Sequence, residues 1–73
     1  MRQYRERMSV EERQKLKNRL LRLTDNGSTG SPSVLAKNLG IGERSVKRLV
    51  SELREEGHNI VYSRHVDSYI IKD

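Results

Sequence analysis

The side chains with the greatest capacity for recognition chemistry lie between residues 43 and 51. Arg44 precedes Lys47 by three residues and Arg48 by four, a spacing that gathers side chains on one side of a helix. Guanidinium and ammonium groups donate hydrogen bonds to phosphate oxygens and to the acceptor edge of guanine, and serine hydroxyls can donate or accept. The candidate contact residues for a nucleic acid are therefore Glu43, Arg44, Ser45, Lys47, Arg48 and Ser51.

The same segment also admits a plainer interpretation. Glu43 stands four residues before Lys47, and Arg48 stands four residues before Glu52. Residues at this spacing can form ion pairs on the solvated face of a helix without any ligand. Two hypotheses for these side chains therefore stay open, contact with a nucleic acid or ion pairing in solvent.

A second group of candidate contacts lies nearer the C-terminus, at Arg64 and His65. Both residues fall between two short runs of strand-like sequence, where the tip of a hairpin is expected. A cationic hairpin tip can contact phosphate or the minor groove of DNA, and it can equally remain solvated.

Metal binding and catalysis find little support in the residue types present. The chain has no cysteine, which excludes disulfides and thiolate metal sites. His58 and His65 have neither a second ligand nor a nucleophile at a useful spacing. We therefore predict a protein that is not an enzyme and that uses no metal, no cofactor and no small-molecule ligand.

Length and charge narrow the class of protein further. The 73 residues leave room for one domain with a small core, and the formal net charge of +5 favours a polyanionic partner. No apolar run is long enough to span a membrane, and the N-terminus lacks the apolar segment of a signal peptide, so we expect a cytoplasmic location. We divide the chain into residues 1–8, a basic N-terminal arm or helix extension, and a domain at residues 9–73.

Capping residues and apolar spacing predict three helices. The first begins after Ser9, ends near Asp25, and has an apolar stripe made of Leu16, Leu20 and Leu23. A serine-proline pair at residues 31 and 32 starts the second helix, which ends at Leu39. The third helix covers residues 43–56, and its apolar stripe consists of Val46, Leu49, Val50 and Leu53.

Beyond residue 57 the apolar spacing changes to two, which is the period of a strand. Ile60 and Tyr62 share one face, Tyr69 and Ile71 share another, and residues 63–68 lie between them. A polar link at residues 28–31 leaves room for one or two residues of extended chain. The predicted order is helix, link, helix, tight turn, helix and β-hairpin, which is an α+β fold.

The tight turn between the second and third helices restricts how they pack. Two helices separated by three residues must cross steeply, so the crossing needs a small side chain and the turn needs glycine. The predicted packing residues of this helix-turn-helix are Leu35, Ala36, Leu39, Gly40, Ile41 and Val46. The third helix then protrudes, and its first half is available to a major groove about 12 Å wide.

Residues 35–48, which read LAKNLGIGERSVKR, resemble the helix-turn-helix of winged-helix bacterial repressors. The DeoR-like regulators and the DNA-binding domain of biotin repressor are the nearest likenesses, and the likeness continues through residues 53–62 and 69–71. The resemblance implies a winged helix-turn-helix, with three helices followed by a two-stranded β-hairpin wing, that binds DNA. The chain departs from the pattern at Gly42, where relatives commonly have a capping serine or threonine, and at Ser68, where they usually have glycine.

Three functions are compatible with these observations. The first is sequence-specific binding of double-stranded DNA by a small transcriptional regulator or mobile-element protein, with the third helix in the major groove and the wing on the backbone or minor groove. The second is a winged helix that binds another protein. The third is RNA or DNA binding without sequence choice, driven by charge. One monomer would read only a half-site, so a homodimer or a partner protein is also left open.

Overall fold

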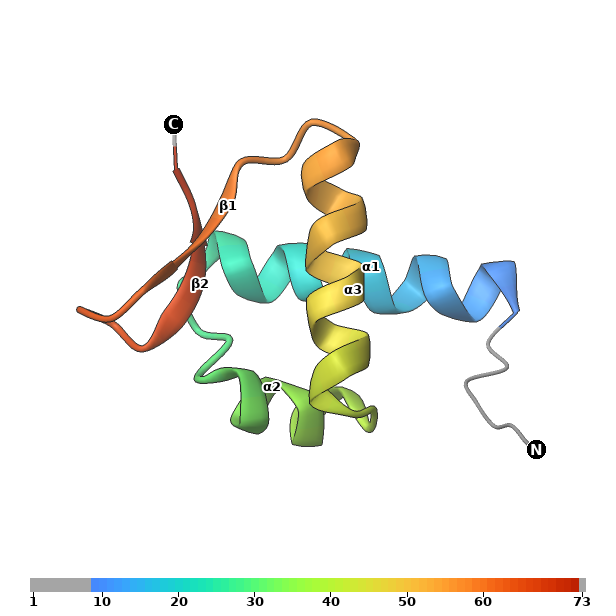
Figure 1. Ribbon diagram of the computed structural model, residues 1–73, viewed down its shortest axis with the longest axis horizontal. Coiled ribbons are helices and arrows are strands. Elements are labelled where there is room, and N and C mark those ends of the chain that lie inside the picture. The colour runs from blue at the N-terminus through green and yellow to red at the C-terminus, as the bar shows by residue number, and fades with distance from the viewer. Residues whose placement is uncertain (1–8, 73) are drawn as a thin grey trace.

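Capping residues and glycines divide the chain into five elements in the predicted order. The computed structural model describes residues 9–72, so the predicted N-terminal arm at residues 1–8 lies outside the described residues. Within this range the elements are α1 (Val10–Asp25), α2 (Pro32–Leu39), α3 (Glu43–Glu55), β1 (Ile60–Ser63) and β2 (Ser68–Ile71) (Figure 1). Three helices followed by a two-stranded antiparallel hairpin confirm the predicted α+β fold with a winged helix-turn-helix layout.

Local hydrogen bonds explain where the first two helices begin. The Ser9 hydroxyl accepts a hydrogen bond from the Glu12 amide at 3.1 Å, and the Glu12 carboxylate accepts one from the Ser9 amide at 3.1 Å. The Ser31 hydroxyl accepts a hydrogen bond from the Val34 amide at 3.3 Å, and Pro32 occupies the first turn. These contacts satisfy amides that a helix leaves without a partner, so both starts follow from local sequence.

The buried side of α1 is more polar than its leucine stripe predicts. Leu20 is fully buried, but Leu16 and Leu23 are only half-buried, whereas Lys17 and Thr24 are buried. Thr24 donates its hydroxyl to the Leu20 carbonyl at 2.7 Å, which satisfies this polar group within the helix. Leu16 and Leu23 pack against the edge of the core, so the predicted stripe is confirmed, and Lys17 and Thr24 widen the buried side of the helix because they find internal partners.

The turn between α2 and α3 has the geometry that its glycines predict. Gly40 has φ 73° and ψ 30°, a left-handed conformation that glycine adopts without steric strain. The Ile41 amide donates to the Ala36 carbonyl at 3.0 Å and closes the end of α2. Of the predicted packing residues, Ile41 is half-buried, and the buried ones are Leu35, Ala36, Leu39 and Val46.

Replacement of Gly42 with serine is predicted to stabilise the protein by about 0.5–1 kcal/mol. Gly42 has φ −81°, gives α3 no side-chain cap, and has no neighbour within 4 Å of an added Cβ. Gly40→Ala is the matched comparison, because φ of 73° makes a side chain there unfavourable by about 1 kcal/mol. Thermal midpoints from circular dichroism should move in opposite directions, and a fall in both variants would contradict the capping argument.

The hairpin places two isoleucines and two tyrosines on a single face. β1 pairs with β2 so that Ile60 lies opposite Ile71 and Tyr62 lies opposite Tyr69. Directly opposite residues of an antiparallel pair point to the same side, so the two faces expected from the sequence are in fact one. The tyrosine rings meet edge to face with centroids 5.2 Å apart, and Ile60 and Tyr69 are buried in the core.

A buried hydroxyl network attaches the hairpin to the link between α1 and α2. The Thr29 amide donates to the Ser68 hydroxyl at 2.9 Å, and the Tyr69 amide donates to the Thr29 hydroxyl at 2.8 Å. Residues 28–31 form no strand, although the sequence leaves room for one or two extended residues there. The Thr29 hydroxyl instead accepts the hydrogen bond of the Tyr69 amide in β2, and its own amide is satisfied by the Ser68 hydroxyl.

Figure 1 shows α1 crossing behind α3, with α2 beside one end of α3 and the hairpin near one end of α1. Every element contributes to one core, which includes Leu20 of α1, Leu35 of α2, Leu49 of α3, Ile60 of β1 and Tyr69 of β2. The side of α3 that faces away from α1 is not covered by any of the other four elements (Figure 1).

Candidate nucleic-acid interface

A row of polar side chains lies on α3 opposite its four buried aliphatic residues. Ser45 is half-buried and has an interaction partner, whereas the other five predicted contact residues of α3 are exposed. We call this exposed set the α3 face, and it consists of Glu43, Arg44, Lys47, Arg48 and Ser51. The structure therefore gathers five of the six predicted side chains on one surface and places the sixth at its border.

The three cations of the α3 face are available to an external acceptor. Within residues 9–72, Arg44, Lys47 and Arg48 form no ion pair, and neither Glu43–Lys47 nor Arg48–Glu52 is paired there. The two ion pairs of the plainer interpretation are thus not formed in this part of the chain, and the exposed side chains fit a solvated face as well as a ligand-binding face. A ligand that binds these groups breaks no ion pair among residues 9–72.

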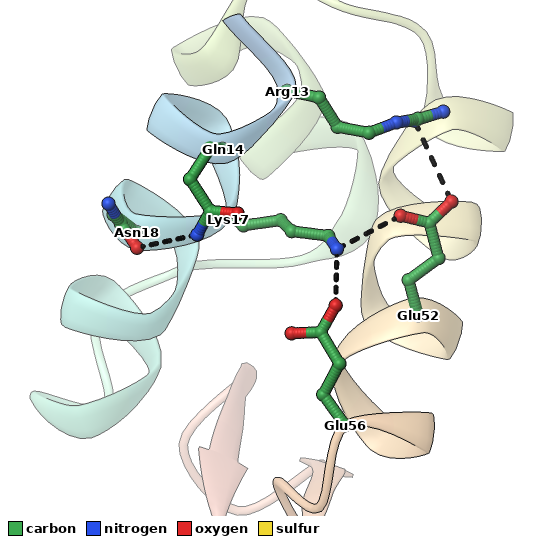
Figure 2. Close-up of polar contacts among 6 residues, drawn as sticks. All are labelled: Arg13, Gln14, Lys17, Asn18, Glu52 and Glu56. Atoms are coloured by element: carbon green, nitrogen blue, oxygen red, sulfur yellow. Dashed lines mark hydrogen bonds and ion pairs between the residues drawn. The ribbon is translucent and has the colours of Figure 1, made fainter. Parts of the chain in front are cut away.

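Two acidic residues at the C-terminal end of α3 are turned toward α1 instead (Figure 2). The Lys17 ammonium lies 3.3 Å from Glu52 Oε1 and donates a short hydrogen bond to Glu56 Oε2. Arg13 Nη1 lies 3.6 Å from Glu52 Oε2, which is an ion-pair contact beyond hydrogen-bonding distance. Cations of one helix therefore neutralise acids of the other.

The environment of Lys17 keeps its side chain charged although the residue is only 8% exposed. The hydrogen bond to Glu56 raises the pKa of Lys17 above its ordinary value of 10.5, burial opposes this rise, and Glu52 adds to it. Two carboxylates thus replace the water that the ammonium loses on burial.

Both tyrosines of the hairpin also have raised pKa values. Desolvation raises the pKa of Tyr62 above 10.0, and the Asp67 carboxylate adds to the rise. Burial raises the pKa of Tyr69 above 10.0, Arg54 opposes the rise, and Glu43 adds to it. In each phenol the fold favours the neutral form.

We predict a loss of stability at alkaline pH that originates in these three groups. The folded protein holds each of these protons to higher pH than the unfolded chain does, so the linked stability is fully present below pH 10.0. It is lost as the pH rises through the folded-state pKa values. Urea midpoints should therefore fall beyond pH 10.0, and less steeply in Tyr69→Phe than in the wild type. An identical decline in that variant would contradict the role given to Tyr69.

Arg64 and His65 occupy the exposed tip of the hairpin at residues 64–67. Asp67 ends this turn in the left-handed region with φ 49°, and the Tyr62 hydroxyl donates to its carboxylate at 3.4 Å. The tip projects away from α3 in Figure 1, so the structure does not bring Arg64 and His65 together with the α3 face. Only an extended ligand could touch both.

The remaining candidate features in the described part of the chain are a metal site, a membrane-spanning helix and a pocket. Residues 9–72 contain no group of three or more side chains suited to hold a metal ion. None of the helices in that range is long and apolar enough to cross a membrane. A shallow groove of about 340 Å³ lies beside α1, lined by Glu12, Lys15, Leu16 and Ile41.

The contacts between Lys17, Arg13 and the acids of α3 are absent from the sequence prediction. A signal for them exists, because Arg13 and Lys17 stand four residues apart and Glu52 and Glu56 stand four residues apart. Matched pairs of opposite charge at helical spacing can meet across two helices. Whether they do meet depends on the crossing of α1 and α3, which no local pattern encodes.

The order of the elements and the short turn between α2 and α3 are compatible with a winged helix-turn-helix layout. Comparisons with protein-family models, with curated proteins and with solved structures find no match for this chain. The assignment of a winged helix-turn-helix layout therefore rests on the arrangement of the elements alone.

Proposed function

We propose that this protein binds double-stranded DNA in a sequence-specific manner, with α3 in the major groove. The observation that carries the proposal is the sorting of charge on α3. Arg44, Lys47 and Arg48 are exposed and form no ion pair within residues 9–72, whereas Glu52 and Glu56 pair with α1. Although Glu43 and Glu55 are exposed as well, three cations without ion pairs on this face favour a polyanionic ligand.

The dimensions of α3 support the same conclusion. Its 13 residues extend about 20 Å, and a major groove about 12 Å wide admits a single helix. Arg44 and Arg48 lie one helical turn apart, so they can reach neighbouring base pairs, where arginine donates two hydrogen bonds to guanine. Lys47 suits a phosphate as a compact charge. We assign the hairpin tip, with Arg64 and His65, to the DNA backbone or the minor groove.

In this proposal the protein is a small transcriptional regulator of the repressor type, or a mobile-element protein, that acts in the bacterial cytoplasm. The resemblance of residues 35–48 to winged-helix repressors supports this role. One α3 reads only a few base pairs, which is too little to define a site in a genome. We therefore include a homodimer on a two-part site, or a partner protein, in the proposal.

Selection of random duplex DNA on the purified protein tests the proposed function. We expect a short motif to be enriched, and two copies at a fixed spacing would indicate a dimer. The enriched pool should bind more tightly than bulk DNA at every salt concentration, and both affinities should fall as salt rises.

Other outcomes of this selection would indicate a different function. Salt-dependent binding without an enriched motif would contradict sequence specificity and indicate a nonspecific or RNA-directed binder. Failure to bind duplex DNA at low salt would overturn the proposal and favour a protein partner.

A further inference from the structure

The cationic character of the α3 face depends on residues outside α3. Residues 43–56 carry four basic and four acidic side chains, so this segment has no net charge of its own. Two of the four acids, Glu52 and Glu56, are held by cations of α1. These contacts leave the rest of the segment with an excess of positive charge.

Glu52 is the acid with the greatest capacity to interfere with a ligand of the α3 face. It stands four residues after Arg48, a spacing at which arginine and glutamate pair on one helix. Its two carboxylate oxygens are occupied separately, Oε1 at 3.3 Å from Lys17 Nζ and Oε2 at 3.6 Å from Arg13 Nη1. While these contacts hold, Arg48 has no ionic partner in residues 9–72.

We propose that Lys17 and Arg13 are positioning residues for DNA binding, because they hold Glu52 and Glu56 against α1 and leave Arg48 available to DNA. This inference rests on the function proposed for the α3 face. Lys17 is 8% exposed and lies between α1 and α3, so it acts through the two carboxylates that it joins. Without it, Glu52 pairs with Arg48, DNA must displace that pair, and the released carboxylates repel phosphate.

The test compares Lys17→Met with Lys17→Met/Glu52→Gln by fluorescence anisotropy of a labelled duplex of mixed sequence at low salt. Lys17→Met should bind about threefold to tenfold more weakly than the wild type, because an internal carboxylate competes with phosphate for Arg48. Addition of Glu52→Gln should restore the wild-type affinity. The matched control is Lys15→Met, which removes the same charge from an exposed position of α1 and should change affinity by less than about twofold.

A coupling measurement separates positioning from a loss of stability. Arg48→Ala should weaken binding less in the Lys17→Met background than in the wild type, because Glu52 already occupies Arg48 there. Circular dichroism at the assay temperature gives the folded fraction of each variant. If Lys17→Met does not fold, Arg13→Met replaces it in the same cycle, because Arg13 makes the longer contact with Glu52.

Two results would overturn the positioning role and leave the proposed function standing. One is an equal effect of Arg48→Ala in both backgrounds, and the other is no recovery of affinity on adding Glu52→Gln. Failure of the wild type itself to bind the duplex would instead overturn the DNA-binding function on which the inference rests.

Discussion

Replacement of Leu35 with alanine is expected to lower the free energy of unfolding by about 3 kcal/mol. Leu35 is 0% exposed and lies in the single core that joins the helices to the hairpin. Its truncation removes buried methyl groups and leaves a cavity that the surrounding helices can only partly fill. A core of this size supplies about 3–5 kcal/mol of net stability, so the variant should retain little of it. Urea unfolding followed by circular dichroism measures the loss.

Val34→Ala is the matched control, because Val34 is the preceding residue of α2 and is 53% exposed. Its replacement should change the free energy of unfolding by less than about 0.5 kcal/mol. Equal losses in the two variants would show that α2 does not pack through Leu35, and would contradict the packing of the helix-turn-helix.

The double variant Arg44→Ala/Arg48→Ala is expected to bind the selected duplex about a hundredfold more weakly than the wild type. Both side chains are exposed on α3 and form no ion pair within residues 9–72, so their removal should disturb the fold little. The salt dependence and the selected motif also distinguish contacts with phosphate from contacts with bases. Loss of phosphate contacts reduces the salt dependence of binding, whereas loss of base contacts relaxes the selected motif.

Lys72→Ala provides the control for loss of charge alone. Lys72 is exposed and follows β2, at the end of the hairpin opposite its tip. Its replacement should reduce affinity by less than about threefold, because a distant charge in salt solution is screened. If the double variant binds as tightly as Lys72→Ala does, α3 is not the DNA-reading helix.

Most of the secondary structure was predictable because short-range interactions set it. Ser9 caps α1 through the Glu12 amide, and Ser31 caps α2 through the Val34 amide, so both partners lie within one helical turn. Gly40 ends α2 because the left-handed backbone there suits glycine. The exposed set on α3 was predictable for the same reason, because the period of the helix separates the cations from the buried aliphatic residues.

Local patterns failed where a polar side chain found a partner far away in the sequence. Lys17 would ordinarily be assigned to a solvated face, yet it is buried because Glu52 and Glu56 surround its ammonium. The assignment of the β1 pair Ile60 and Tyr62 and the β2 pair Tyr69 and Ile71 to different faces of the hairpin was wrong for a related reason. Strand periodicity gives the alternation within each strand, but only the pairing register relates one strand to the other.

The sequence by itself determined the order and limits of the elements, the basic balance of the chain and which residues of α3 face outward. These properties depend on hydrogen bonds and periodicities that span only a few residues. Only the tertiary structure decided that cations of α1 pair with Glu52 and Glu56 at the end of α3. It alone also decided that Thr29 hydrogen-bonds to Ser68 in the hairpin. The contacts of Lys17 with Glu56 and of Thr29 with Ser68 join residues 39 positions apart, and their formation depends on how separate elements cross, which no local pattern specifies.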